Sequence, residues 1–532
     1  MHKVAASSMM EHLAAVPEES ATGFTAAYPP CDSYRDSIRG VAWPEWSIRS
    51  TLPFLPGHSG SNYSSGSSAL SSYLSNNSGY CSSGLGSAGA DELTKIAHRM
   101  VSDGYTQRMV QAFGDDGGED RALENWFVEL DVDWVLQMGD GYDLQRQLEL
   151  QATPASWLQG LVERWIRALT VIVVSIKKEL VSAVLHERPL VAQFGKASIS
   201  KMLVFIDPIL DVFKVENLQS MLRMYICVSG ASHDMLTMDS QITSQVQVIF
   251  TDVSDSLVHS LISSKARSIF TEMGSSLETQ ADNLIEAIST VMKKVGTILN
   301  DEEEDASWAV EILRGGGEIH RKTRFMVDCI VFMRKTHAST QSSSQSQNSR
   351  KLCGLIQDMT DYLNNLLLQK SELCLDPSLT YLFLLNNSYF VAQMSEPSIP
   401  SDVERPSSLH HPTLKLTPEC ERYMDSYLDS SWGYVVSFIL VQSNSLRQPK
   451  SRKKNSLLAK FQSAFHQTYQ TQKFWKVPDP QLRSLLRETI TKRVISGYRD
   501  YLKEHPELEK QVRGGSNSPE VLEEMLGELF EG

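Results

Sequence analysis

Basic side chains near the carboxyl terminus are the residues of this chain with the clearest chemical potential. Between positions 447 and 513 the sequence carries sixteen Lys or Arg and six Asp or Glu, whereas the whole chain of 532 residues has a formal net charge of −14. A basic end on an acidic body favours one orientation on an anionic surface. The candidate contacts are Lys492, Arg499, Lys503, Lys510 and Arg513.

A helix over about 481–503 is the element that must position the first three of these cations. Two prolines force a turn just before it, and apolar residues then recur at helical spacing from Leu482 to Tyr501. At ~100° per residue, the three cations fall within about 40° of one another on its polar side. A shorter helix should follow, with Ser518 as its N-cap and Pro519 at its first position.

Nucleic acid is the other polyanion that a basic surface could bind. Binding of single strands needs aromatic side chains beside the cations, because the bases stack on them. Tyr498 and Tyr501 are the aromatic candidates, but both fall on the apolar side of the expected helix. The sequence therefore disfavours a nucleic-acid partner.

Two glycine patterns could bind phosphate, but neither has the required context. The segment GLGSAG at 84–89 formally matches a dinucleotide fingerprint, yet no strand is expected before it and the tract is rich in Ser and Gly. The glycines at 315–317 are not followed by the Lys-Ser/Thr of a P-loop. A tight turn between helices is expected there.

The histidines and the acidic run do not have the spacing of a catalytic or metal-binding constellation. His410 and His411 lie in a Pro-rich stretch without a Cys or carboxylate at ligand spacing, and His320 is interpreted as structural. The acidic run 301–305 lacks the glycine and the spaced ligands of a calcium loop, which favours a solvated turn. We therefore predict no enzymatic activity, no cofactor and no metal.

Cysteine usage and hydropathy bear on the compartment. Seven scattered cysteines without a C-x-x-C pair argue for reduced thiols. No apolar stretch approaches the roughly 20 residues of a membrane span, and the amino terminus lacks the apolar core of a secretory signal. These features predict a cytoplasmic protein.

Composition divides the chain into parts. Residues 1–89 include a Ser/Gly-rich tract that cannot bury enough apolar surface to order itself, which predicts a disordered arm. From Ala90 onward nearly every segment has helical period, so the expected fold is all-α, with about three bundles in series. We expect helical bundles over 90–335, a polar linker over 336–350, and carboxyl-terminal bundles with a basic tip over 351–532.

Several segments resemble the exocyst complex 70-kDa subunit family. The most specific is the family's Trp-x-Val-Pro-Asp-Pro-x-Leu-Arg turn, which is 475–483 here, followed by a Leu-Phe-Glu-Gly finish at 529–532. The last residues are most similar to plant members. Upstream, and in family order, the Trp-Ile-x-Ala helix, the Gly-Gly-x-Val-His segment and the Asn-Asn segment are matched by 165–193, 315–333 and 366–393.

The resemblance implies an elongated rod of cullin-repeat-like bundles that docks secretory vesicles at the plasma membrane in exocytosis. It implies a protein peripheral to that membrane, with other exocyst subunits, Rho-type small GTPases and phosphatidylinositol phosphates as partners. The family's Glu-Lys-x-x-Lys, which contacts phosphoinositides, corresponds to 509–513, with Lys510 and Arg513 as its bases. At roughly 1 kcal/mol per base, these two give only ~2 kcal/mol. Lys492, Arg499 and Lys503 would have to share the surface.

Two departures from the family pattern leave a second function open. The family's amino-terminal long-helix region, which packs against other exocyst subunits, has no counterpart, and the Ser/Gly-rich arm stands in its place. The basic loop after the Asn-Asn motif is replaced by the Pro-rich residues 395–418. The alternative is an interaction adaptor outside the exocyst, in plant immunity, as a target or partner of immune receptors or pathogen effectors.

Overall fold

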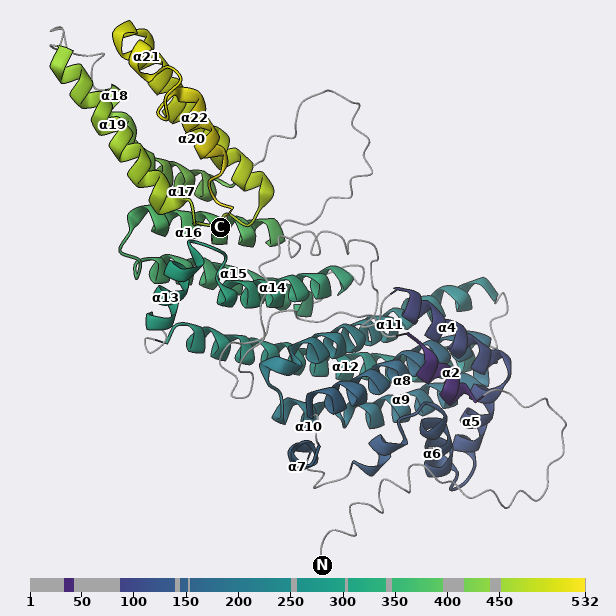
Figure 1. Ribbon diagram of the computed structural model, residues 1–532. Helices are drawn as coiled ribbons and strands as arrows, with labels where there is room; N and C mark the ends of the chain where they lie inside the picture. Colours follow the sequence, from purple (N-terminus) through teal and green to yellow (C-terminus); the bar gives the residue numbers. More distant parts are fainter. Residues whose placement is uncertain are drawn as a thin grey trace, which may run out of the picture.

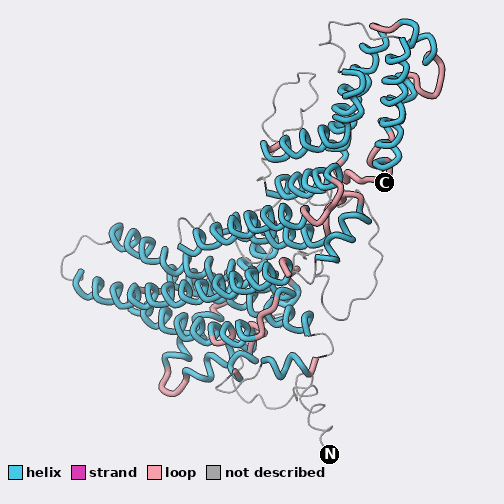
Figure 2. Tube along the Cα trace, turned by 90° about the vertical axis from the view of Figure 1, so that its left-hand side faces the viewer, coloured by secondary structure: helices cyan, strands magenta, loops and turns pink. Residues whose placement is uncertain are grey.

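Helices stacked along one long axis make up the part of the chain that the computed structural model describes (Figure 1). The described residues are 33–42, 87–138, 144–151, 154–249, 256–301, 305–340, 347–395, 416–440 and 451–531. Within these ranges there is no strand, and an isolated antiparallel bridge joins Lys476 to Glu531. Figure 2 shows the same elongated stack from the side. The expected all-α fold is confirmed.

The amino-terminal body is built around one long helix, α8 (Pro154–Ser182). Its apolar stripe is buried, and Trp165 Nε1 donates a hydrogen bond to the Met202 carbonyl at 2.8 Å. Val184, two residues past the end of this helix at Ser182, is 56% exposed. The other α-helices of this body are α4 (Ser87–Ser102), α5 (Tyr105–Gly114), α6 (Glu119–Glu129), α7 (Leu144–Glu149), α9 (Arg188–Leu203) and α10 (Ile206–Asp211).

A short helix, α2 (Tyr34–Gly40), lies inside the segment that the sequence predicts to be disordered. Its apolar side chains are buried, and it packs against α4, α6 and α8. The prediction of disorder over 1–89 is therefore wrong for residues 33–42, and also for 87–89, where α4 begins. The remaining positions of that segment lie outside the described residues.

Two long helices, α11 (Leu218–Ile249) and α12 (Ser256–Leu299), join the two halves of the molecule. They pack on each other, α11 also contacts α14 (Arg321–Thr340), and α12 contacts both α9 and α15 (Gln347–Ser371). Helices α14 and α15 thus extend from both sides into the expected polar linker, of which 341–346 lie outside the described residues. The two predicted halves pack as one continuous stack.

The carboxyl-terminal part continues this stack (Figure 1). A π-helical turn, Asp429–Gly433, connects two of its helices and buries Trp432. Its helices are α13 (Asp305–Gly315), α16 (Pro377–Ser395), α17 (Pro418–Leu428), α18 (Tyr434–Leu440), α19 (Ser451–Gln472), α20 (Pro480–Lys503), α21 (Pro506–Val512) and α22 (Pro519–Gly527).

Local sequence signals set the bounds of the last helices. The helix expected over 481–503 is α20, and Asp479 Oδ1 caps it by accepting a hydrogen bond from the Leu482 amide at 2.7 Å. Its predicted apolar face, from Leu482 to Tyr501, is at most 3% exposed. Ser518 is the N-cap of α22, as predicted, with Pro519 at the first helical position.

Three segments far apart in the sequence meet where α20 joins the rest of the stack. We call them the asparagine junction: residues 315–320, Asn386 with Asn387 on α16, and residues 475–477. Asn386 Nδ2 donates to the carbonyls of Gly317 (2.7 Å) and Lys476 (2.8 Å), and the Lys476 amide donates to the Gly316 carbonyl at 3.0 Å. Buried turns leave backbone groups that no helix pairs, and the asparagine amides provide their partners.

The junction predicts a specific glycine requirement. Gly316 has φ of +56°, and a Cβ there would lie 3.0 Å from Trp475 Cα. Gly316→Ala should therefore combine left-handed strain, about 1–2 kcal/mol, with a collision that no side-chain motion relieves. We expect the free energy of unfolding in urea to fall by roughly 2–4 kcal/mol.

Gly514→Ala is the matched control, because Gly514 has φ of +76° but no atom within 4 Å of the added Cβ. It should cost about 1–2 kcal/mol from strain alone. Equal losses in the two variants would contradict a packing role for the glycine turn.

Candidate anion-binding surface

The candidate cations lie along α20, on α21 and in the turn after it, at the end of the molecule farthest from the amino-terminal body (Figure 1). Lys492 sits near the middle of α20, about 16 Å along the axis from Lys503 at ~1.5 Å per residue. Lys503 ends that helix, and Lys510 and Arg513 follow on α21 and its C-cap. The five side chains therefore line an extended surface and do not converge on one pocket.

Two of the five cations already have ion-pair partners. Arg499 Nη2 lies 2.7 Å from Glu523 Oε2 of α22, and Lys503 Nζ lies 3.0 Å from Asp500 Oδ1. Both pairs are largely solvated, so each contributes little to stability, but each cancels a positive charge on this surface. The sequence could not reveal the first pair, because Glu523 is distant along the chain.

The other three cations are exposed and available. Lys492, Lys510 and Arg513 make no ion pair within the part of the chain that the structure describes. Their neighbours Glu507 and Glu509 on α21 are exposed as well. The tip consequently presents a mixture of charges and not a uniform cationic field.

Several arginines of α20 make structural contacts within the protein. Arg487 Nε donates to the Leu529 carbonyl at 2.8 Å, and Arg483 Nε donates to the Val477 carbonyl at 2.9 Å. Arg493 forms an ion pair with Asp429 at 2.5 Å. These contacts join α20 to the turn before it, to the last residues of the chain and to the π-helical turn. The high local count of bases therefore overstates the charge that is free to meet a ligand.

Helix α19 packs beside α20. It begins at Ser451, and residues 441–450 lie outside the described part. The ring centroids of Phe461 and Tyr498 are 4.6 Å apart, which sets α19 beside α20. Since the two helices run in opposite directions, the first turn of α19 lies near the end of α20 (Figure 1).

His320 is a buried structural residue, as expected. Its ring stacks on Trp308 with centroids 3.7 Å apart, its Nδ1 accepts a hydrogen bond from the Lys322 amide, and its Nε2 lies 3.2 Å from Glu311 Oε2. Burial lowers the pKa of His320, and the attraction of Glu311 only partly offsets this. With a side chain 1% exposed, the imidazole cannot reach a substrate.

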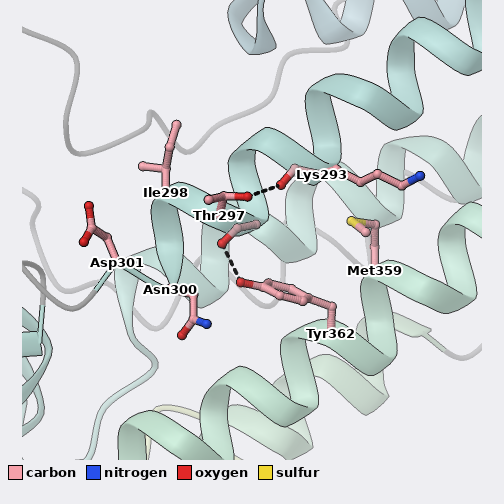
Figure 3. A pocket seen from close by; sticks show the side chains of 8 residues that line it. Lys293, Thr297, Ile298, Asn300, Asp301, Met359 and Tyr362 are labelled. Carbon is pink, nitrogen blue, oxygen red and sulfur yellow. Dashed lines mark hydrogen bonds between the residues drawn. The ribbon is translucent and has the colours of Figure 1, made fainter.

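A cavity of about 690 Å³ opens between the end of α12 and the middle of α15 (Figure 3). Tyr362 Oη donates to the Gly296 carbonyl at 2.5 Å and thereby caps the last turn of α12. Lys293 points away from this tyrosine, and Asp301 lies on the opposite side of the hollow (Figure 3). The charged groups do not converge on a common point.

Neither a metal cluster nor a membrane span is present within the described ranges. No group of three or more His, Cys, Asp or Glu there has the geometry to hold a metal ion. The helices in these ranges are all too short or too polar to cross a bilayer.

A family model for the carboxyl-terminal region of the Exo70 protein of the exocyst complex matches residues 163–528. The matched region runs from the first turns of α8 to the residue after α22. It includes the whole asparagine junction and all five candidate cations.

Curated relatives are similar over different shares of the chain. Identity to the exocyst complex component EXO70C1 of Arabidopsis thaliana is 30% over 171 residues, covering 31% of this chain and 25% of the relative. Identity to EXO70E2 of the same organism is 22% over 475 residues, covering 82% and 64%. The chain spans from a quarter to about two thirds of the length of these relatives.

A solved structure, the Saccharomyces cerevisiae exocyst component Exo70p, aligns with 82% of this chain and 94% of its own at 12% identity. The TM-score of this alignment is 0.33.

The environment of His320 predicts an acid-sensitive fold. The folded pKa of His320 lies below the value near 6.5 of an unfolded chain. Between these two pKa values the unfolded state binds a proton that the native state does not bind. The stabilisation is fully present above that unfolded pKa and is lost as the pH falls toward the folded pKa. Between pH 7 and pH 5, His320 should lower the free energy of unfolding by up to about 2 kcal/mol.

His320→Phe keeps the stacked ring but removes this titration. Urea denaturation at pH 7, 6 and 5 should show a weaker pH dependence for the variant than for the wild type. An unchanged dependence would mean that the native imidazole is protonated as readily as the unfolded one.

Proposed function

The chain belongs to the Exo70 family of exocyst subunits, and from this premise we propose that it acts in exocytosis, without catalysis, to hold secretory vesicles at the plasma membrane. Other exocyst subunits and Rho-type small GTPases are its proposed protein partners. Phosphatidylinositol phosphates on the cytoplasmic face are its proposed lipid partner, which makes it a peripheral membrane protein. The observation that carries the membrane contact is the group of exposed, unpaired cations at the far end of the stack.

The number of available cations sets the strength of that contact. Each base near an anionic leaflet contributes roughly 1 kcal/mol. Lys492, Lys510 and Arg513 together would supply ~3 kcal/mol, which is about 150-fold in affinity. Arg499 and Lys503 add less, because a lipid phosphate must compete with Glu523 and Asp500 for them.

The carboxylates at the tip favour a specific headgroup over a simple anionic bilayer. Glu507 and Glu509 are exposed beside Lys510 and Arg513, so they repel any diffuse negative surface. A phosphate in direct contact with a guanidinium gains two parallel hydrogen bonds at short range. Such contacts outweigh the repulsion more readily for a polyphosphorylated inositol than for a singly charged headgroup.

Removing the available cations should abolish most lipid binding. For the triple variant Lys492→Gln, Lys510→Gln and Arg513→Gln, we expect on the order of 100-fold weaker co-sedimentation with vesicles containing phosphatidylinositol 4,5-bisphosphate. The paired bases should matter less, so Arg499→Gln with Lys503→Gln should weaken binding by about tenfold or less.

The matched control removes three exposed bases from the amino-terminal body: Lys95→Gln, Lys178→Gln and Lys201→Gln. It changes the net charge by the same amount and should leave vesicle binding within about twofold of the wild type. If the control loses as much as the tip variant, net charge alone governs binding and the proposed surface is wrong.

Assembly is a separate test. The full-length chain, tagged and recovered from its own tissue, should bring down other exocyst subunits in near-equal amounts. The tip variant should recover them equally well, because its changes are solvent-exposed and touch no helix contact. Recovery of immune receptors or other proteins without any exocyst subunit would exclude the exocyst role and favour the adaptor.

A further inference from the structure

Helix α2 packs its apolar face against the surface of the amino-terminal body. Tyr34, Ile38 and Val41 are 7%, 1% and 2% exposed, and they occupy one face of a segment of about two turns. The Tyr34 ring lies 5.5 Å from the Tyr105 ring, and the Arg99 guanidinium lies 5.1 Å above it. These buried apolar and aromatic side chains fix the position of α2 on the surface.

The basic side chains of α2 form ion pairs with carboxylates of the body. Arg35 Nε and Arg39 Nη2 both bind Asp131 Oδ1, at 3.0 and 2.6 Å, and Arg35 also reaches Asp133 at 3.3 Å. The Asp131 side chain is only 2% exposed, and its Oδ2 has no hydrogen-bond partner within the described residues. The two arginines therefore supply most of the compensation for a buried charge.

Backbone geometry presents this carboxylate to α2. Asp131 has φ of +64°, a left-handed conformation in which Asp and Asn are enriched among non-glycine residues. Burial alone would raise the pKa of Asp131, but the hydrogen bonds and charges of Arg39 and Arg35 more than reverse this, with a smaller effect of Arg164. A buried anion that faces two cations of a segment distant in the sequence can recognise that segment by its charge.

The receiving surface combines α4, α8 and the segment from α6 to Asp133. Helix α4 packs on α8, and α5 contacts α4, α6 and α8 and so connects these elements. At its rim, Tyr34 Oη donates to Asp103 at 2.6 Å, Ser33 Oγ donates to Glu129 at 3.3 Å, and Arg167 donates to the Val41 carbonyl at 3.2 Å. The body thus contributes an acidic rim and apolar floor.

The length of chain between α2 and the body allows exchange. Residues 43–86 connect Val41 and Ala42 to the start of α4. Fully extended, 44 residues reach about 145 Å. A segment that belongs to the same chain as its site can occupy that site even when its intrinsic affinity is modest.

From these contacts we infer that the surface under α2 is a docking site for short, basic amphipathic helices, which residues 33–42 fill in cis. The partner it fits is a peptide segment of another protein with the same pattern. That pattern is an aromatic residue at position i, arginine at i+1, an aliphatic residue at i+4 and arginine at i+5. In this chain these are Tyr34, Arg35, Ile38 and Arg39. This inference is independent of membrane binding, because the site lies in the amino-terminal body.

Cleavage of the intact chain tests whether α2 is exchangeable. A protease site inserted between residues 60 and 61 of the full-length protein would convert the tether into a free end. After cutting, a synthetic peptide of residues 30–44 in excess should displace the amino-terminal fragment, as seen by gel filtration. Retention of the fragment at millimolar peptide, or loss of the body's cooperative melting after cutting, would show that α2 is an integral part of the fold.

Direct binding measures the recognition chemistry. A fluorescent peptide of residues 30–44 should bind the cut and emptied protein with micromolar affinity and the uncut wild type at least tenfold more weakly. Asp131→Asn should weaken the peptide at least tenfold, since asparagine tolerates the left-handed backbone and loses only the charge. Asp116→Asn is the control and should change affinity by less than about threefold, because this carboxylate is exposed on the turn between α5 and α6, outside the contacts described for α2.

Two results would overturn the docking site. One is equal binding of the peptide to wild-type protein and to emptied protein, which would place it elsewhere on the surface. The other is full affinity in Asp131→Asn, which would mean that the arginines of α2 do not recognise this carboxylate.

Discussion

The pairing of buried backbone groups at the asparagine junction is the constraint on which the carboxyl-terminal half depends. Turns at 315–320 and 475–477 carry carbonyls and amides that no helix can satisfy, and they are enclosed between α13, α16 and α20. Asn386 bridges the two turns, while Asn387 accepts a hydrogen bond from the His320 amide at 3.0 Å. Without these amides, each unpaired group would cost about 1–3 kcal/mol. The junction therefore fixes where the last bundle leaves the stack.

Local sequence patterns were sufficient for much of this fold. The bounds and apolar face of α20, the cap at Ser518 and the glycine turn follow from spacing, proline and glycine within a few residues. Helix α2 could not be predicted in this way, because two turns have weak intrinsic stability and Tyr34 and Ile38 gain their burial from α4, α6 and α8. Tertiary contact, and not local preference, orders that segment.

At the candidate surface, too, local sequence alone does not show which cations are paired. Counting bases indicated one end of the molecule, but Arg487 donates to the Leu529 carbonyl and Arg499 forms an ion pair with Glu523. Which cations are available depends on helix packing across distant positions. Net charge per segment thus indicates a region, whereas ion pairing decides which side chains within it can meet a phosphate.

The length of α12 has a mechanical consequence. Its 44 residues extend over about 66 Å and contact both α9 and α15. A force that separates the two halves of the molecule must part α12 from α9 or from α15 along the length of the helix, breaking many contacts at once. Peeling a terminal helix would break them one turn at a time. The central stack should therefore resist stretching and transmit load as a stiff strut.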